Sequence, residues 1–202
     1  MRFSDSEGGD CRHESMSSAQ LAPPDDAYLV RAVLDGDVDA YGLLVNRYAA
    51  EYMRFAVRML GTVEDADEVL HTAFYRAYSH LDSCQDPARF GAWLYRIVVN
   101  ECRTRASRRG RRERRLVRDE AALAQLPASD RADDQFALRE ELQRAIDRLP
   151  VESREAFVLK YVEELSYEEM SEITGAGISA LKMRTKRACE RLREILEDDR
   201  DA

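Results

Sequence analysis

The chain has 202 residues, enough for one domain of ordinary size or for two small ones. Hydrophobic residues make up 45% of it and charged residues 35%, with few glycines and prolines, which is typical of a folded, helix-rich protein. The net charge of −8 excludes a protein coated in basic charge, although the basic residues are clustered. No apolar run approaches the roughly 18 residues of a membrane helix, and the N-terminus lacks the apolar segment of a secretion signal.

The four cysteines, Cys11, Cys84, Cys102 and Cys189, are too far apart in the sequence for a zinc motif. Isolated cysteines without a secretion signal indicate a reducing, cytoplasmic location. Cys102 stands beside Arg103, which leaves open a structural thiol, the favoured interpretation, or a thiol of lowered pKa that senses oxidants. Cys11 and His13 do not make a metal site, and we predict neither a metal nor a cofactor.

The chain begins with a polar segment and then becomes helical. Residues 1–24 are rich in Ser, Asp, Glu and Gly, which predicts a disordered tail; Met1 and Met16 both remain possible starts. From there apolar residues recur at spacings of three and four, with no alternating strand pattern. We expect four helices: one capped by Asp25 or Asp26 and closed by Gly36, one over 38–60 ending at Gly61, one from Thr62 to about His80, and one that holds 90–98.

A basic tract follows the fourth of these helices. Residues 103–118 hold nine arginines and a single acid, Glu113, and the sign of the charge then reverses over 119–134. A solvated face or a disordered arm is the plainer interpretation of such a tract. Its density favours binding to a polyanion, because each neutralised phosphate releases counterions. The acidic stretch, with Pro127 and small residues, is typical of a linker.

A second helical unit begins near Phe136. One amphipathic helix ends at Pro150, and another covers about 152–163. The sequence therefore predicts an all-α fold of two small helical domains joined by a flexible linker. The expected parts are the tail 1–24, a first domain 25–110, a linker 111–137 and a second domain 138–197.

The last third of the chain has the pattern of a helix-turn-helix. Ser166 and Glu169 have the spacing of a capping box, and Gly175 can end that first helix in the left-handed conformation. In the second helix, an apolar stripe recurs at spacings of seven, four and three; its members are Leu181, Ala188, Leu192 and Ile195. Basic residues occupy the other face, as in a DNA-reading helix. The alternative is an ordinary helical hairpin with a solvated charged face.

Four stretches together suggest a family. They are Asp65–Tyr78, Phe90–Asn100, the segment from Leu149 to Glu169, and the helix after Gly177. In this order and spacing they resemble RNA polymerase sigma factors of the sigma-70 family, extracytoplasmic function (ECF) subfamily, over about 25–197. The resemblance implies that the first domain is sigma region 2, which binds core polymerase and opens the −10 element. The second would be sigma region 4, whose helix-turn-helix reads the −35 element.

The resemblance also implies site residues. For binding core polymerase they are Asp65, Asp67, Glu68, His71 and Thr72. His71 and Thr72 replace the family's usual Gln-Glu pair. For the −10 element they are Tyr95, Arg96, Asn100 and Arg103, with the loop 84–89, in which Cys84 replaces a frequent aromatic. For the −35 element they are Ser179, Lys182, Met183, Arg184, Lys186 and Arg187.

Other features follow from the residues and the resemblance. Phe90 and Trp93 have helical spacing, and we expect Trp93 mainly in the core. The implied partners are core RNA polymerase, through the clamp helices of its largest subunit and its flap, promoter DNA, and an anti-sigma factor, with no membrane insertion. The acidic linker would thread the polymerase RNA channel. The alternative is a stand-alone helix-turn-helix regulator, which needs neither the acidic helix nor the Trp93 segment. An enzyme is least supported, because no nucleophile–base set, phosphate-binding loop or metal cluster is visible.

Overall fold

The computed structural model describes residues 24–116 and 134–201, and every regular element in these ranges is helical. The N-terminal domain consists of four helices and two short 3-10 turns: α1 (Asp26–Leu34), α2 (Val38–Leu60), α3 (Val63–Ser79), η1 (Leu81–Ser83), η2 (Pro87–Arg89) and α4 (Phe90–Leu116). The C-terminal domain consists of α5 (Asp134–Asp147), α6 (Val151–Phe157), a π-helical turn η3 (Val158–Val162), α7 (Tyr167–Thr174) and α8 (Ile178–Asp201). The predicted all-α architecture is confirmed.

The first three helices of the N-terminal domain begin and end close to where the sequence predicts. The Asp25 carboxylate accepts a hydrogen bond from the Tyr28 N–H at 2.7 Å, and the Thr62 hydroxyl accepts one from the Asp65 N–H. Gly61 ends α2 with φ of 81°, a left-handed conformation that favours glycine. Side-chain caps and glycine stops are local signals, and they set these boundaries.

Two boundaries differ from expectation. The helix that begins at Phe90 continues through the basic tract to Leu116, six residues past the expected end of the first domain at 110. Arginine is a good helix former, and nothing in the tract after Gly110 breaks the helix before Leu116. Helix α5 begins at Asp134, four residues before the expected start of the second domain at 138. Residues 1–23 of the expected tail lie outside the described residues, and so do residues 117–133 in the middle of the expected linker.

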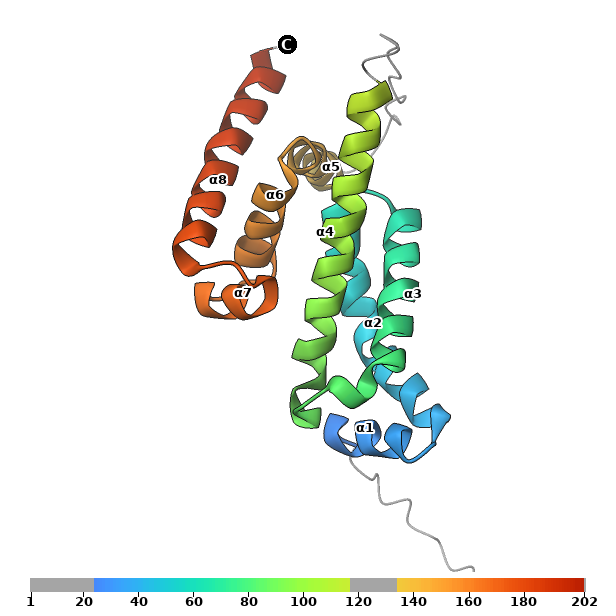
Figure 1. The fold of residues 1–202 in the computed structure, drawn as a ribbon. Coiled ribbons are helices and arrows are strands. Elements are labelled where there is room, and N and C mark those ends of the chain that lie inside the picture. The colour runs from blue at the N-terminus through green and yellow to red at the C-terminus, as the bar shows by residue number, and fades with distance from the viewer. Residues whose placement is uncertain (1–23, 117–133, 202) are drawn as a thin grey trace, which may run out of the picture.

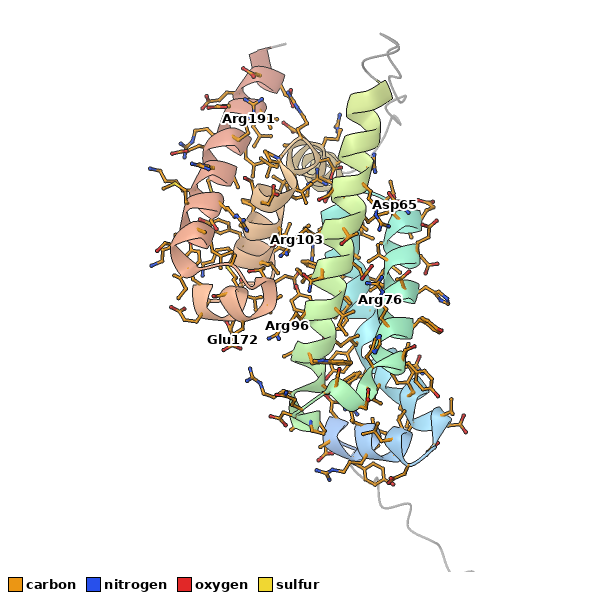
Figure 2. All side chains as sticks on the ribbon, in the orientation of Figure 1. Asp65, Arg76, Arg96, Arg103, Glu172 and Arg191 are labelled. Atoms are coloured by element: carbon orange, nitrogen blue, oxygen red, sulfur yellow. The ribbon has the colours of Figure 1, made fainter. Side chains whose placement is uncertain are left out.

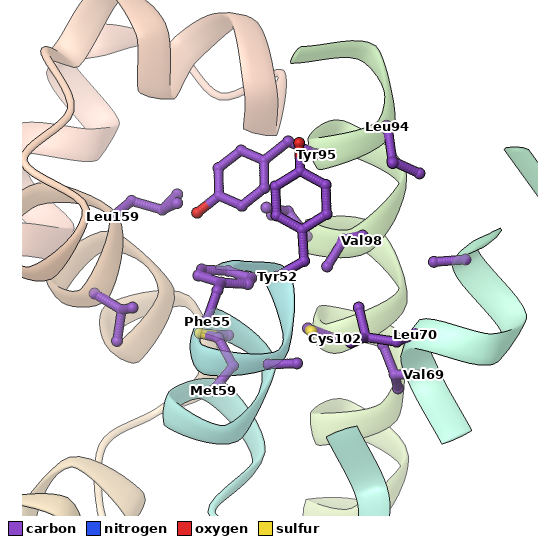
Figure 3. Close-up of a cluster of buried hydrophobic side chains, with 14 of the residues drawn as sticks. Tyr52, Phe55, Met59, Val69, Leu70, Leu94, Tyr95, Val98, Cys102 and Leu159 are labelled. Atoms are coloured by element: carbon purple, nitrogen blue, oxygen red, sulfur yellow. The ribbon is translucent and has the colours of Figure 1, made fainter. Parts of the chain in front are cut away.

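The two domains pack side by side and share one core. Figure 1 shows α2, α3 and α4 running alongside one another, with α1 across one end and the C-terminal helices beside α4. The helix α4 contacts both α6 and α7, and α2 contacts α5. Phe55, Met59 and Tyr95 belong to the same buried cluster as Leu159 of the C-terminal domain (Figure 3). No helix in the described ranges is both long enough and apolar enough to span a bilayer.

Candidate nucleic-acid interface

The helix-turn-helix has the predicted geometry. Ser166 and Glu169 form a reciprocal capping box: the Glu169 N–H donates to the Ser166 hydroxyl at 3.2 Å, and the Ser166 N–H donates to a Glu169 carboxylate oxygen at 2.8 Å. The Glu169 carboxylate accepts hydrogen bonds from the Ser166 N–H and from the Ser166 hydroxyl, and these two bonds to the charged form lower the pKa of Glu169. Gly175 ends α7 with φ of 71°, and α8 begins three residues later.

Helix α8 separates an apolar face from a basic one. The predicted stripe is buried at all four positions. Thr185, which the apolar pattern does not include, is also buried, and its hydroxyl donates to the Leu181 carbonyl at 2.9 Å. Met183 is 49% exposed, so its apolar thioether side chain lies on the surface among the basic residues. The predicted −35 set lies on this outer face: Ser179, Lys182, Met183, Lys186 and Arg187 are exposed, and Arg184 is half-buried. A helix with such a face suits the major groove, where side chains reach base edges.

One aromatic residue positions the basic face and was missed in the sequence. The Lys182 ammonium lies 5.5 Å from the centroid of the Tyr167 ring, and the Lys160 ammonium lies 5.0 Å from the same ring. A cation over an aromatic face is held by the ring's quadrupole. Tyr167 therefore links α7 to a residue of the recognition face.

A groove beside the recognition face is rich in arginine. It has a volume of about 650 Å³ and lies between α6 and α8. Its lining includes four arginines: Arg148, Arg184, Arg187 and Arg191. Guanidinium groups bind phosphate oxygens in a fixed fork geometry, so this groove fits a DNA backbone next to a base-reading helix.

In the N-terminal domain, one side of α4 and the loop before it form a second candidate surface. We call it the melting face; it consists of Cys84, Arg89, Trp93, Arg96, Asn100 and Arg103. Arg96 and Asn100 are exposed, as expected. Trp93 packs against Phe90, with ring centroids 5.8 Å apart, and also lines a cavity of about 400 Å³. The Cys84 thiol is buried in the loop and donates to the Asp86 carbonyl at 3.5 Å.

Tyr95 does not lie where we expected. Its side chain is 9% exposed, stacks on Tyr52 and meets the edge of Phe55. The reason is its register on α4, because Tyr95 and the buried Val99, Cys102 and Ala106 recur at spacings of four, three and four. In this arrangement of the domains Tyr95 therefore faces the core and not solvent, and its role at the −10 element stays a prediction.

Part of the basic tract is paired within the protein. Arg103 donates to the two carboxylate oxygens of Glu155, at 2.6 and 2.8 Å, and Arg105 donates to Asp65 at 2.5 and 3.0 Å. Arg109 lies 3.5 Å from the same Asp65 carboxylate, while Arg108 is exposed. Within the described residues, the tract therefore serves the fold as well as offering positive charge to a polyanion.

The acidic helix α3 presents most of the predicted polymerase-binding residues. Asp67, Glu68 and His71 are exposed, and Thr72 is half-buried, with its hydroxyl donating to the Glu68 carbonyl. Asp65 differs, because its carboxylate is held by Arg105 and Arg109, and the Arg105 hydrogen bond lowers its pKa. Figure 2 shows Asp65 near one end of α3, which runs alongside α4.

The buried thiol Cys102 is structural. It is fully buried on α4, and burial raises its pKa to about 12, with the nearby carboxylates acting in the same direction. A thiol with a raised pKa carries little of the reactive thiolate, so burial favours the structural interpretation over the redox-sensor alternative. Within the described ranges no group of side chains suits a metal ion, and Cys11 and His13 lie outside them.

Both halves of the chain match families of known proteins. The family described as "Sigma-70 region 2" matches residues 44–112, and "Sigma-70, region 4" matches residues 139–192. The ECF RNA polymerase sigma factor SigW of Bacillus subtilis is 32% identical over 180 residues, covering 84% of this chain and 95% of SigW. The chain belongs to the ECF subfamily of sigma-70 sigma factors. It is a non-enzymatic polymerase subunit that directs promoter-specific transcription initiation. A stand-alone regulator is not supported, because the matches cover the acidic helix and the Trp93 segment as well.

Other relatives agree with this assignment. The ECF RNA polymerase sigma-E factor of Escherichia coli K12 is 32% identical over 174 residues, covering 82% of this chain and 91% of that protein. Among solved structures, CnrH in complex with the cytosolic domain of CnrY has a TM-score of 0.58 and 28% identity, covering 86% of this chain and 98% of CnrH. The sigma factor RpoE of Bartonella quintana, in complex with the anti-sigma factor NepR, has a TM-score of 0.58 and 25% identity, covering 79% and 98% of the two chains.

Proposed function

We propose that this sigma factor grips its promoter at two points, with the basic face of α8 on the −35 element and the melting face on the −10 element. The observation that carries the proposal is the division of α8 into a buried apolar stripe and an outer face of exposed cations around Met183. Lys182 and Arg187 suit the acceptor-rich edges of purines, and Met183 suits a thymine methyl group. Arg184 lines the arginine groove and suits a phosphate.

At the −10 element, the proposed role of the melting face is to hold a base that has left the stack. Extruding a base costs a few kcal/mol, which hydrogen bonds to its freed edge help offset. Asn100 and Arg96 are exposed donors on the same helix as Trp93, and the cavity beside Trp93 offers an apolar wall. Asn100 is the residue to which we assign hydrogen bonding with the extruded base.

The proposed contact with core polymerase uses the exposed part of α3, around Asp67, Glu68 and His71. The remaining proposals rest on the relatives. Two solved relatives are in complex with an anti-sigma factor or with the cytosolic domain of CnrY, and we propose that this chain is also restrained by an anti-sigma factor. We place the protein in the cytoplasm, where its polymerase acts.

One assay tests the promoter grip. Core polymerase is combined with wild-type, Arg187→Ala or Asn100→Ala protein, and promoter binding and transcription initiation are measured on a library of promoter variants. Arg187→Ala should weaken promoter binding by about 1–3 kcal/mol and relax selectivity at one −35 base pair. Asn100→Ala should reduce initiation on duplex DNA and leave initiation on a pre-melted template and binding to core polymerase unchanged.

The control is Arg144→Ala, an exposed arginine on α5 away from the recognition face. Unchanged −35 selectivity in Arg187→Ala would refute the α8 assignment. Equal loss of Asn100→Ala activity on duplex and pre-melted templates would place the melting function elsewhere. Adding a candidate anti-sigma factor to the same reaction should abolish initiation by the wild-type protein.

A further inference from the structure

One cavity of the molecule has no role in the proposed promoter grip. It has a volume of about 340 Å³ and is lined by residues of α2, of α4 and of the C-terminal domain. Cavities of roughly 300–1,000 Å³ are typical of small-molecule sites. It adjoins the cavity beside Trp93, and Arg89 and Ile173 belong to the lining of both. We call it the tyrosine cavity, after its aromatic lining residues Tyr48, Tyr52 and Tyr95.

The three tyrosines form a continuous stack with one unused hydroxyl. The ring centroids of Tyr48 and Tyr52 are 5.4 Å apart, and those of Tyr52 and Tyr95 are 5.1 Å apart. Tyr52 donates to the Gly91 carbonyl at 2.8 Å, and Tyr48 donates to Asp26. Tyr95 is only 9% exposed, yet its hydroxyl has no hydrogen-bond partner within the described residues. A buried hydroxyl without a partner is unfavourable, so a ligand that bonds to it gains affinity.

The unused hydroxyl lies near the acids of the cavity. Burial raises the pKa of Tyr95, and the charges of Glu163 and Glu51, both lining residues, raise it further. The phenol is therefore neutral, and its oxygen keeps its capacity to accept a hydrogen bond. A cation held by these carboxylates is the donor that the Tyr95 oxygen lacks.

The lining of the tyrosine cavity is acidic. Among the described residues that line it, one is an arginine, Arg89, and four are glutamates: Glu51, Glu163, Glu169 and Glu172. Arg89 pairs with Glu172 at 3.2 Å, and the Glu169 carboxylate belongs to the capping box. Glu51 is exposed and forms no ion pair with the described part of the chain. A positive ligand charge is therefore attracted to Glu51 and Glu163.

Glu163 is only partly neutralised by the protein. Its side chain is 16% exposed, and Arg58 lies 3.2 Å from its Oε1 atom. The second carboxylate oxygen accepts no hydrogen bond from any described residue. Burial raises the pKa of Glu163 even with Arg58 beside it, so the charged form is not fully compensated. A second cation at this carboxylate would stabilise its charged form.

We propose that the tyrosine cavity binds a linear aliphatic diamine or polyamine. One ammonium group donates to Glu163 and to the Tyr95 hydroxyl, a second is held by Glu51 at the exposed edge, and the carbon chain packs on the tyrosine rings. An ammonium group has three donors, which suits several acceptors around one nitrogen. A compact metal ion is a poorer match, because no described group of side chains has the arrangement of a metal site.

The test is calorimetric titration of the full chain with putrescine, a linear diamine, in about 0.15 M salt. This salt concentration screens loose attraction to the net charge of −8. We expect saturable binding of one molecule per chain and a higher melting temperature, because a ligand of the folded state stabilises it. Butanediol, which lacks the charges, and magnesium chloride, which lacks the carbon chain, should produce neither effect.

Two variants locate the site. Tyr95→Phe removes the hydroxyl and keeps the ring, and it should weaken putrescine binding by about tenfold, since hydrogen bonds to charged groups are the stronger ones. Its matched control is Tyr28→Phe, at a tyrosine that is 62% exposed on α1. Glu51→Gln should weaken binding severalfold, whereas Glu64→Gln, an equal change of charge at an exposed position of α3, should not.

Three results would overturn the proposal: no saturable binding of putrescine, equal binding of magnesium, or an affinity that neither Tyr95→Phe nor Glu51→Gln reduces. Both variants leave the buried apolar core intact, and circular dichroism verifies that they fold. The titration uses no DNA and no polymerase. Its outcome is therefore independent of the promoter assignments, which the Arg187→Ala and Asn100→Ala experiments test.

Discussion

At the residue scale, Asp65 forms ion pairs within the protein at a position that was expected to bind the polymerase. The resemblance assigns it to polymerase binding, but its carboxylate faces inward to Arg105 and Arg109 and ties the start of α3 to α4. Asp67, two positions later, is exposed and keeps its charge available. We therefore propose that Asp67 and its exposed neighbours, rather than Asp65, supply the charge that meets the polymerase.

The Asp65 ion pairs predict a pH-dependent effect on stability. The pKa of Asp65 is lowered in the folded protein, so its contribution is present above the unfolded pKa and is lost as the pH falls through the folded pKa. Asp65→Asn should lower the free energy of unfolding by about 1 kcal/mol near neutral pH. The difference from wild type should shrink as the pH falls below the unfolded pKa of about 3.9 and should be gone once the pH is below the lowered folded pKa. Urea unfolding over a series of pH values from neutral to acidic measures it.

Asp67→Asn, an exposed change on the same helix, is the control and should leave the unfolding free energy unchanged. A pH-independent loss in Asp65→Asn would mean that packing, rather than the ion pairs, is responsible.

At the element scale, α7 contacts both of the candidate DNA-binding surfaces. Its N-terminus is held by the capping box, its Tyr167 ring supports Lys182 of the recognition face, and its outer residues Glu172 and Ile173 close the melting face. With eight residues the helix is too short to be stable by itself, so its position depends on its cap and on packing through Met170. A loosened α7 is expected to affect both surfaces.

The capping box gives a direct test of this dependence. Ser166→Ala removes the hydroxyl acceptor of the Glu169 N–H and should lower the free energy of unfolding by about 1 kcal/mol. Glu168→Gln, an exposed change one residue earlier than Glu169, serves as the control. Thermal unfolding followed by circular dichroism measures the loss, and equal stability of Ser166→Ala and wild type would show that the cap is not needed.

At the scale of the whole molecule, one buried cluster includes residues of both domains. Domains that share a core unfold together, whereas domains that only share a linker unfold separately. The packing of the two domains on each other thus has a thermodynamic signature that can be measured without any DNA assay.

Trp93, the single tryptophan of the chain, allows that signature to be measured. In wild-type protein the urea transitions followed by Trp93 fluorescence and by far-ultraviolet circular dichroism should coincide, because one signal reports the N-terminal domain and the other reports all helices. In Glu155→Gln the transitions should separate as the domains uncouple. Non-coincident transitions already in the wild-type protein would contradict a shared core.

The sequence by itself determined the helices, their caps, the helix-turn-helix and the family. Ser166 and Glu169, or Leu181 and Ala188, lie within two turns of each other, so their spacing alone predicts the structure that they form. Only the tertiary structure decided which charges meet and which side of α4 is buried. Arg103 and Glu155 are 52 residues apart, and Arg105 and Asp65 are 40 apart. No local pattern indicates such pairs, because they depend on how the helices pack, and the same packing buries Tyr95 and places α7 over the melting face.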